Sequence, residues 1–127
     1  MVVGNYNIFQ VRIALEVLPT KEEKLKYLYQ IKKEIRNIIK HFSESTILPL
    51  RSYANAYHLI DDHCPELAQF IKELVLKYSY DARDQRSPSE EFLKRMVKNE
   101  VKNYLRFEEY LDIELDSVMK GSVSFVS

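Results

Sequence analysis

Apolar residues recur at spacings of three and four over most of this chain, which predicts amphipathic helices. The pattern is clearest over residues 65–78, after Pro65, where the apolar face comprises Leu67, Phe70, Ile71, Leu74, Val75 and Tyr78. A second stripe, of heptad character, comprises Leu25, Leu28, Ile31, Ile35, Ile38 and Phe42. Thr20 and Glu23 form a capping box before it, so we expect a helix from there to about His41.

Two further segments are predicted to be helical. Residues 49–60 form a short helix with Leu50, Tyr53, Ala54 and Tyr57 on one side. Residues 6–18 are ambiguous between two structures. Alternating Val11, Ile13, Leu15 and Val17 indicate a strand, whereas Ile8, Val11, Leu15 and Leu18 fit a helical stripe. We favour the helix, because we find no second strand signal with which this segment would pair.

The last long segment, residues 87–121, is predicted to be one continuous helix. Ser87 is placed to cap it, Pro88 suits the first helical position, and Glu90 completes a capping box. Gly121 supplies the stop signal. A heptad-like apolar stripe continues through the segment, interrupted by Glu108 with Phe107 alongside it. At 1.5 Å per residue such a helix is about 50 Å long.

These elements predict an all-α fold, a four- to five-helix bundle with a long C-terminal helix. Two glycines and four prolines offer little material for β-hairpins, and 127 residues suffice to bury a core without a metal or a disulfide. We expect residues 1–120 to form a single helical-bundle domain. Residues 121–127 are expected to be a flexible tail, or a short strand that forms only on a partner.

Charges along the last helix are sorted into two blocks. The basic block contains Lys94, Arg95, Lys98, Lys102 and Arg106, and the acidic block contains Glu108, Glu109, Asp112, Glu114 and Asp116. This order opposes the helix macrodipole, which prefers acidic residues first, so a partner surface explains it better than local helix stability. Two copies paired antiparallel would place each basic block against an acidic one. The intrachain alternative is that the basic second helix neutralises the acidic block.

Composition excludes several classes of function. Lys and Arg together number 19, as do Asp and Glu, so no global basic field attracts nucleic acid or an acidic membrane. We find neither a signal peptide nor the roughly 18 apolar residues of a membrane span, and we expect a cytoplasmic protein with no membrane partner. The single cysteine, Cys64, excludes an internal disulfide.

One cluster was considered as a metal site. It comprises His58, Asp61, Asp62, His63 and Cys64. The mixture matches no standard coordination set, and the two aspartates have an ordinary task at helix ends before Pro65. We therefore predict no metal and no cofactor.

A second cluster concerns RNA. Arg51 is followed six and seven residues later by Tyr57 and His58, with Ser52 just after the arginine. This pattern resembles the ribonuclease motif of HEPN domains, helical proteins in which such an arginine and histidine act on the RNA phosphodiester. The resemblance covers only residues 51–58. It implies an RNA-cleaving enzyme whose catalytic residues are Arg51, Tyr57 and His58, which is the alternative to a non-enzymatic protein.

Basic stripes give a third hypothesis. Lys33, Arg36 and Lys40 share one face of the second helix, and the basic block of the last helix forms another face. A nucleic-acid-binding regulator would use either stripe. We rank first a non-enzymatic protein-interaction or regulatory module, binding a protein partner or forming a homodimer. The proposed interface residues are Lys94, Lys98, Lys102, Arg106, Glu108, Glu109, Asp112 and Asp116. The ribonuclease ranks second and the nucleic-acid-binding regulator third.

Overall fold

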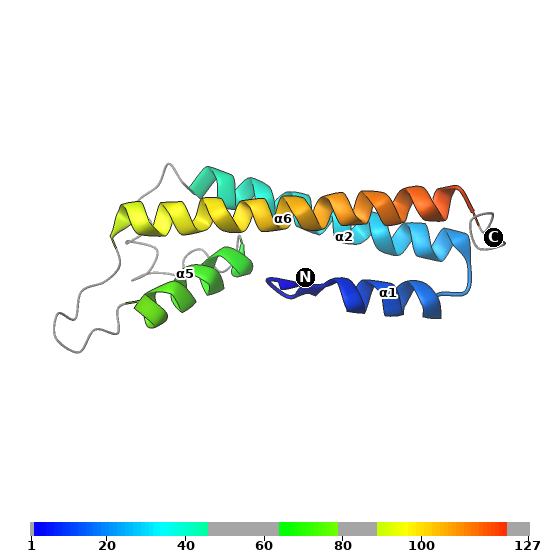
Figure 1. Ribbon diagram of the computed structural model, residues 1–127, viewed down its shortest axis with the longest axis horizontal. Coiled ribbons are helices and arrows are strands. Elements are labelled where there is room, and N and C mark those ends of the chain that lie inside the picture. The colour runs from blue at the N-terminus through cyan, green and yellow to red at the C-terminus, as the bar shows by residue number, and fades with distance from the viewer. Residues whose placement is uncertain (1, 46–63, 79–88, 122–127) are drawn as a thin grey trace. The chain divides into compact units, whose positions relative to one another are not determined.

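The computed structural model describes residues 2–45, 64–78 and 89–121, and this part of the chain contains four α-helices (Figure 1). They are α1 (Ile8–Val17), α2 (Lys21–Ser45), α5 (Pro65–Tyr78) and α6 (Glu90–Met119). Two short strands, β1 (Val2–Val3) and β2 (Tyr6–Asn7), precede α1. The all-α prediction with a long C-terminal helix is confirmed. At 30 residues, α6 is about 45 Å long.

Side-chain caps fix where the helices begin. The Thr20 hydroxyl accepts a hydrogen bond from the Glu23 amide at 3.1 Å, so the predicted cap of α2 is confirmed. α2 continues to Ser45, four residues beyond the expected end. At α6, the Ser89 hydroxyl accepts from the amide of Phe92 at 3.1 Å. The prediction that Ser87 caps this helix is therefore wrong, because Ser89 satisfies the free amide of the first turn.

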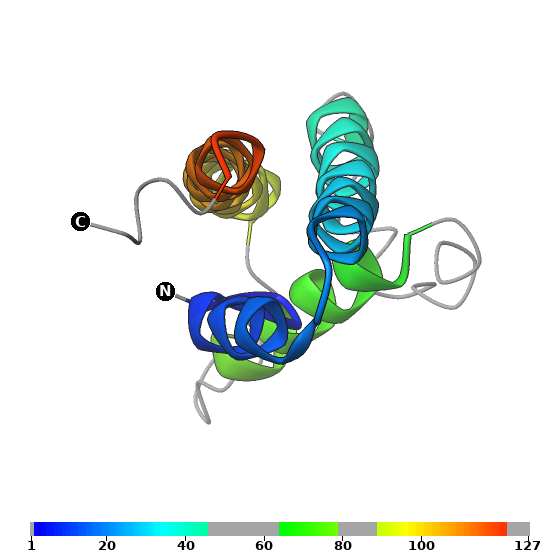
Figure 2. The same cartoon turned by 90° about the vertical axis from the view of Figure 1, so that its right-hand side faces the viewer.

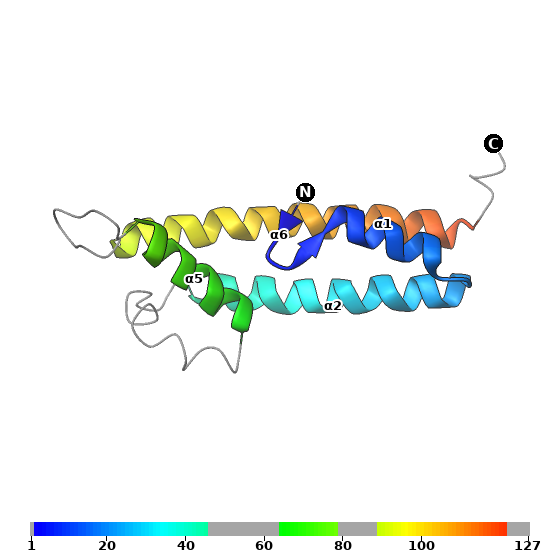
Figure 3. The ribbon, with the colours of Figure 1, turned by 90° about the horizontal axis from the view of Figure 1, so that it is seen from below.

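The ambiguous N-terminal segment is helical from Ile8 to Val17, which confirms the preference for a helix. A partner strand does exist, however, since β1 and β2 pair antiparallel and join through a turn at Gly4, whose φ of +57° favours glycine (Figure 3). The expectation of no second strand signal was wrong. Asn7 ends the hairpin and caps α1, because its Oδ1 accepts a hydrogen bond from the Phe9 amide at 2.8 Å.

The chain divides into two compact units. The first comprises Met1–Asn37 and Asn103–Ser127. Within it, α1, the first part of α2 and the last part of α6 stand at the corners of a triangle (Figure 2). Its buried apolar side chains are Val3, Val11, Leu15, Leu28, Ile31, Ile35, Tyr104, Phe107, Leu111 and Leu115. The predicted heptad stripes of α2 and α6 therefore supply most of this core.

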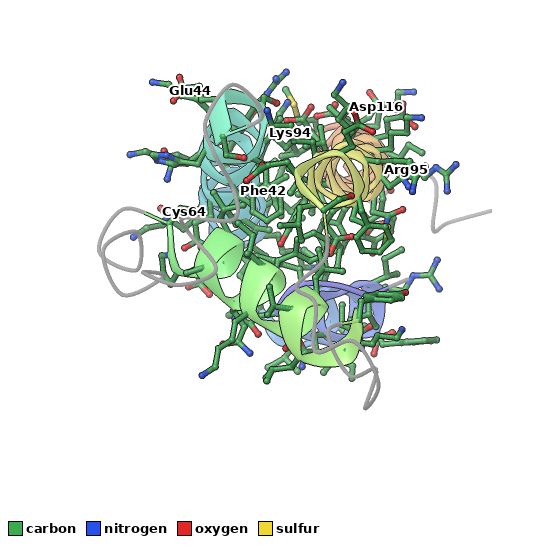
Figure 4. The ribbon with its side chains drawn as sticks, turned by 90° about the vertical axis from the view of Figure 1, so that its left-hand side faces the viewer. Phe42, Glu44, Cys64, Lys94, Arg95 and Asp116 are labelled. Atoms are coloured by element: carbon green, nitrogen blue, oxygen red, sulfur yellow. The ribbon has the colours of Figure 1, made fainter. Side chains whose placement is uncertain are left out.

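The second unit, Ile38–Lys102, is built from the end of α2, from α5 and from the start of α6. Aromatic contacts join these helices, with ring centroids 5.7 Å apart for Phe42 and Phe70 and 4.8 Å apart for Tyr78 and Phe92. Figure 4 shows Phe42 on the inner side of α2, facing the other two helices. The buried apolar side chains of this unit include Ile38, Ile39, Phe42, Cys64, Leu67, Ala68, Ile71, Leu74, Leu93 and Val97.

Candidate protein-binding surface

α1 is apolar on two opposite sides. Val11 and Leu15 point into the core of the first unit. Phe9, Ile13 and Val17 are 65%, 60% and 73% exposed. Their spacing of four residues places them in one row along the helix, which we call the outer stripe. An amphipathic helix at a protein surface normally has one apolar side, which faces the core, so a second apolar side that is exposed is a candidate contact surface.

Arg12 and Glu16 lie on one flank of α1, between the outer stripe and the core, and both are exposed. They also border a groove of about 670 Å³ within the first unit, where α1 meets the start of α2 and the end of α6. The groove is lined by Arg12, Leu15, Glu16, Lys21, Lys24, Glu114, Ser117, Val118 and Gly121. Its volume lies within the range of small-ligand sites.

The charged residues that line this groove form no ion pairs with one another. Three cations and two carboxylates line it, yet among the described residues none of the five is within 4.0 Å of an opposite charge. Lys21 Nζ instead donates a hydrogen bond to the carbonyl oxygen of Met119 at 3.2 Å, at the end of α6. Arg12 and Glu16 therefore form no ion pair within the described part of the chain.

Tyr110 lies beside the same flank. Burial raises the pKa of its phenol, and the nearby Glu114 carboxylate raises it further, while the Arg12 guanidinium acts in the opposite direction. The phenol therefore stays neutral at physiological pH. The Arg12 guanidinium lowers the pKa both as a hydrogen-bond donor to the phenol and through its charge, although no bond of good alignment forms at the Oη in the described part of the chain. This chemistry suits binding rather than proton transfer.

Ion pairs join α2 to α6 in the first unit. Lys32 Nζ donates to Asp112 Oδ1 at 2.6 Å, and Arg36 Nε lies 2.6 Å from Glu108 Oε2. Glu108 is only 7% exposed, and its Oε2 receives no well-aligned hydrogen bond, so the contact with Arg36 is a charge pair. These contacts agree with the intrachain alternative, in which the basic second helix neutralises the acidic block.

The acidic residues predicted for an interface therefore have different surroundings. Glu108 is buried against α2, and Asp112 is held by Lys32. Asp116 pairs with Lys120 one turn along the same helix, at 2.9 Å. Glu109 is exposed and forms no ion pair among the described residues. Glu109 and Asp116 are thus the members of the predicted acidic set that are not paired with α2.

The basic residues of the same prediction are more available. Lys98, Lys102 and Arg106 are exposed, and Lys94 is half-buried. Within residues 2–45, 64–78 and 89–121, no carboxylate forms an ion pair with any of these four. Arg95 lies on the side of α6 away from α2 and packs its guanidinium over the Phe92 ring (Figure 4). These basic side chains therefore have no ion-pair partner in the described part of the chain.

The second predicted basic stripe is weaker. Lys33 and Lys40 are exposed on α2, but Arg36 is held by Glu108. Two of the three residues therefore remain for a phosphate backbone.

Cys64 is buried at the start of α5, where its thiol donates to Glu66 Oε2 at 3.8 Å. Burial raises the pKa of this thiol to about 11, so it is a poor nucleophile. The other residues weighed for a metal site, His58, Asp61, Asp62 and His63, lie outside the described residues. Among the described ones, no group of three or more metal-binding side chains gathers.

The catalytic alternative also lies outside the described part of the chain, because Arg51, Tyr57 and His58 all fall between its first two ranges. It stays a prediction, to be tested by assaying RNA cleavage in the Arg51→Ala and His58→Ala variants.

Comparisons with known proteins name no relative: no family model, curated protein or solved structure matches this chain. None of the helices in the described residues combines the length and the apolar composition required to cross a membrane. Sequence reasoning missed the outer stripe, although a signal was present. The strand-like alternation of Val11, Ile13, Leu15 and Val17 takes residues in turn from the two apolar sides of one helix.

Proposed function

We propose that this protein is a non-enzymatic interaction module that associates with itself through the outer stripe of α1. The observation that carries the proposal is the exposure of Phe9, Ile13 and Val17 in one row on a helix whose opposite side is already buried. Water contact with such a row is unfavourable, and burial against another protein surface relieves it.

The size of the stripe limits the affinity. Complete burial of one such side chain contributes about 1.5–3 kcal/mol, so three that are roughly two-thirds exposed contribute about 3–6 kcal/mol per copy. Two copies contribute about 6–12 kcal/mol, against an association cost of about 4–15 kcal/mol. We therefore expect a dissociation constant in the micromolar range or weaker.

The sorted charges of α6 have a secondary part in this proposal. With Glu108 and Asp112 already paired to α2, the outer side of α6 offers Lys98 and Arg106 before Glu109. Exposed ion pairs contribute about 0.2–1 kcal/mol each, so these charges would influence the orientation of a complex more than its affinity.

The test replaces the outer stripe with glutamine, which keeps helix propensity and removes apolar surface. Molar mass of the wild type and of the triple variant Phe9→Gln, Ile13→Gln, Val17→Gln is measured by light scattering up to about 100 µM, at low and at high salt. The matched control is Ile113→Gln, a similarly exposed apolar residue on α6. We expect the wild type and the control to associate and the triple variant to stay monomeric with an unchanged helical signal. A wild type that is monomeric throughout contradicts the proposal.

A second function, nucleic-acid binding, is favoured by one observation: Lys98, Lys102 and Arg106 are exposed and unpaired among the described residues. Three phosphate contacts would give log K against log salt a slope of about −2.7 on duplex DNA. Binding of a labelled duplex over a salt series measures it. Affinity that does not respond to salt would exclude this function.

A further inference from the structure

We infer that the outer stripe of α1 is covered by α1 of a second copy, docked antiparallel across a two-fold axis that passes between Ile13 and Ala14. The inference rests on the proposed function and specifies its geometry. Two features of α1 carry it: the symmetry of the stripe and the order of the charges on one flank.

The stripe is symmetric about its central residue. Phe9 and Val17 lie four residues on either side of Ile13, about 6 Å away along the helix. Antiparallel docking therefore places the large Phe9 ring against the smaller Val17 of the partner subunit, at both ends of the contact. Ile13 meets its own copy in the middle. Each position is filled by a large and a small side chain, or by two of medium size, as close packing requires.

The flank charges distinguish antiparallel from parallel docking. Arg12 precedes Glu16 by one turn on the same flank. A two-fold axis perpendicular to the two helices brings this flank against its own copy in the reverse direction. Arg12 then faces Glu16 of the partner subunit, and Glu16 faces the partner's Arg12. Parallel docking would set like charges together, which costs free energy.

Among the described residues, neither flank residue is committed to an ion pair, and the one neighbour that Arg12 contacts through its guanidinium is the neutral Tyr110 phenol. Each is exposed, and within the described part of the chain neither has an opposite charge within 4.0 Å. The other charged residues on this side are Lys21, Lys24 and Glu114, which line the neighbouring groove. The flank is thus an uncompensated pair of opposite charges, in the order that a two-fold axis makes self-complementary.

The extent of α1 makes this a weak, transient contact. Its ten residues span about 15 Å, and three apolar side chains cover less than the roughly 800 Å² per partner of a standard interface. Association should therefore respond measurably to single charge changes at the rim, where the flank residues lie.

The decisive experiment uses charge reversal and rescue, with the full chain. Arg12→Glu alone and Glu16→Arg alone each set like charges against one another twice in the dimer. We expect each to weaken self-association by roughly ten-fold in sedimentation velocity. An equimolar mixture of the two variants restores both attractive pairs, so the mixture should associate as tightly as the wild type. A mixture no tighter than either variant alone overturns the inference.

The matched control applies the same reversal to two exposed residues of α2 that are also four residues apart, with Glu22→Arg and Lys26→Glu. We expect neither to weaken association. Rescue confined to this pair would assign the two-fold contact to α2 and overturn the inference for α1.

Cross-linking gives an independent readout of the same geometry, because Cys64 is buried and its thiol has a raised pKa. An Ile13→Cys variant lies next to its own copy at the axis and should form a disulfide-linked dimer under mild oxidant. Phe9→Cys should cross-link efficiently only when mixed with Val17→Cys. Efficient cross-linking of Phe9→Cys with itself would indicate parallel docking.

Failure of the inference and failure of the proposed function give different results. If the glutamine variant of the stripe dissociates while charge reversal has no effect, the stripe associates in another geometry and only the inference fails. If the glutamine variant associates like the wild type, the proposed function fails as well.

Discussion

The two glycines of the chain allow one structural argument to be tested quantitatively. Both have positive φ, +57° at Gly4 and +74° at Gly121, and both lie in the first unit. An L-residue in this region of backbone conformation costs about 1–2 kcal/mol, because its Cβ approaches the following carbonyl. If backbone conformation alone mattered, alanine at either position would lower the free energy of unfolding by a similar amount.

The surroundings of the two glycines differ. A Cβ at Gly121 meets nothing within 4 Å, whereas a Cβ at Gly4 would overlap the hydroxyl oxygen of Tyr104. Tyr104 is 1% exposed, so its ring cannot swing into solvent to make room. Overpacking of this kind costs about 1–3 kcal/mol. We therefore expect Gly4→Ala to cost about 2–5 kcal/mol and Gly121→Ala about 1–2 kcal/mol or less, since Gly121 follows the end of α6, where helices fray.

Urea denaturation followed by circular dichroism measures both losses of unfolding free energy, provided that the slope of this free energy against urea concentration (the m-value) is the same in all variants. Adding Tyr104→Phe removes the atom that the new Cβ would meet. The double variant should therefore be more stable than the sum of the two single effects predicts, by about 1 kcal/mol or more. Equal costs at the two glycines, or additivity in the double variant, would refute this account of the hairpin.

Three further predictions concern stability. Arg36→Ala should lower the free energy of unfolding, measured by urea denaturation, by about 1–2 kcal/mol, because it leaves the buried Glu108 carboxylate unpaired. Lys32→Ala removes a more exposed ion pair and should lower it by at most about 1 kcal/mol. Equal losses in the two variants would contradict the difference in burial. The folded state retains the Cys64 proton up to about pH 11, while an unfolded thiol titrates near 8.5, so the free energy of unfolding should fall as pH rises through this interval, and more steeply than in Cys64→Ala. Asn7→Ala should lower the free energy of unfolding by about 1 kcal/mol, because it removes the hydrogen-bond acceptor for the Phe9 amide. The start of α1 should then fray and self-association, measured by light scattering, should weaken. An unchanged molar mass would show that association does not depend on this cap.

Helix periodicity predicted the fold class and most of the core, because a buried helical face requires apolar residues at fixed spacings whatever packs against it. The predicted stripe of α5 contains the buried Leu67, Ile71 and Leu74. Boundaries were less accurate, since they depend on which of several suitable residues supplies the cap. At the start of α6, both Ser87 and Ser89 are residue types that cap helices, and nothing in the sequence shows that Ser89 is the one that does so.

The hairpin was missed for a similar reason. Two-residue strands carry too short a pattern to recognise, and their pairing depends on a turn at Gly4. The outer stripe of α1 was not predicted, because the two apolar patterns of this segment were taken as alternatives, one for a helix and one for a strand. A segment that satisfies both patterns, as residues 6–18 do, can also be a helix with two apolar sides.

The acidic block of α6 shows what a single helix cannot reveal about its own charges. Along α6 alone, acids near the C-terminus oppose the macrodipole, and the sequence therefore predicts a second molecule that neutralises them. In the first unit, however, Arg36 and Lys32 of α2 lie against Glu108 and Asp112, so tertiary packing supplies the missing cations. Because these acids are paired within the chain, the exposed apolar surface of α1 favours self-association more than the charges of α6 do. The outer stripe of α1 stays largely exposed within the described part of the first unit, so we expect a second molecule to bind there.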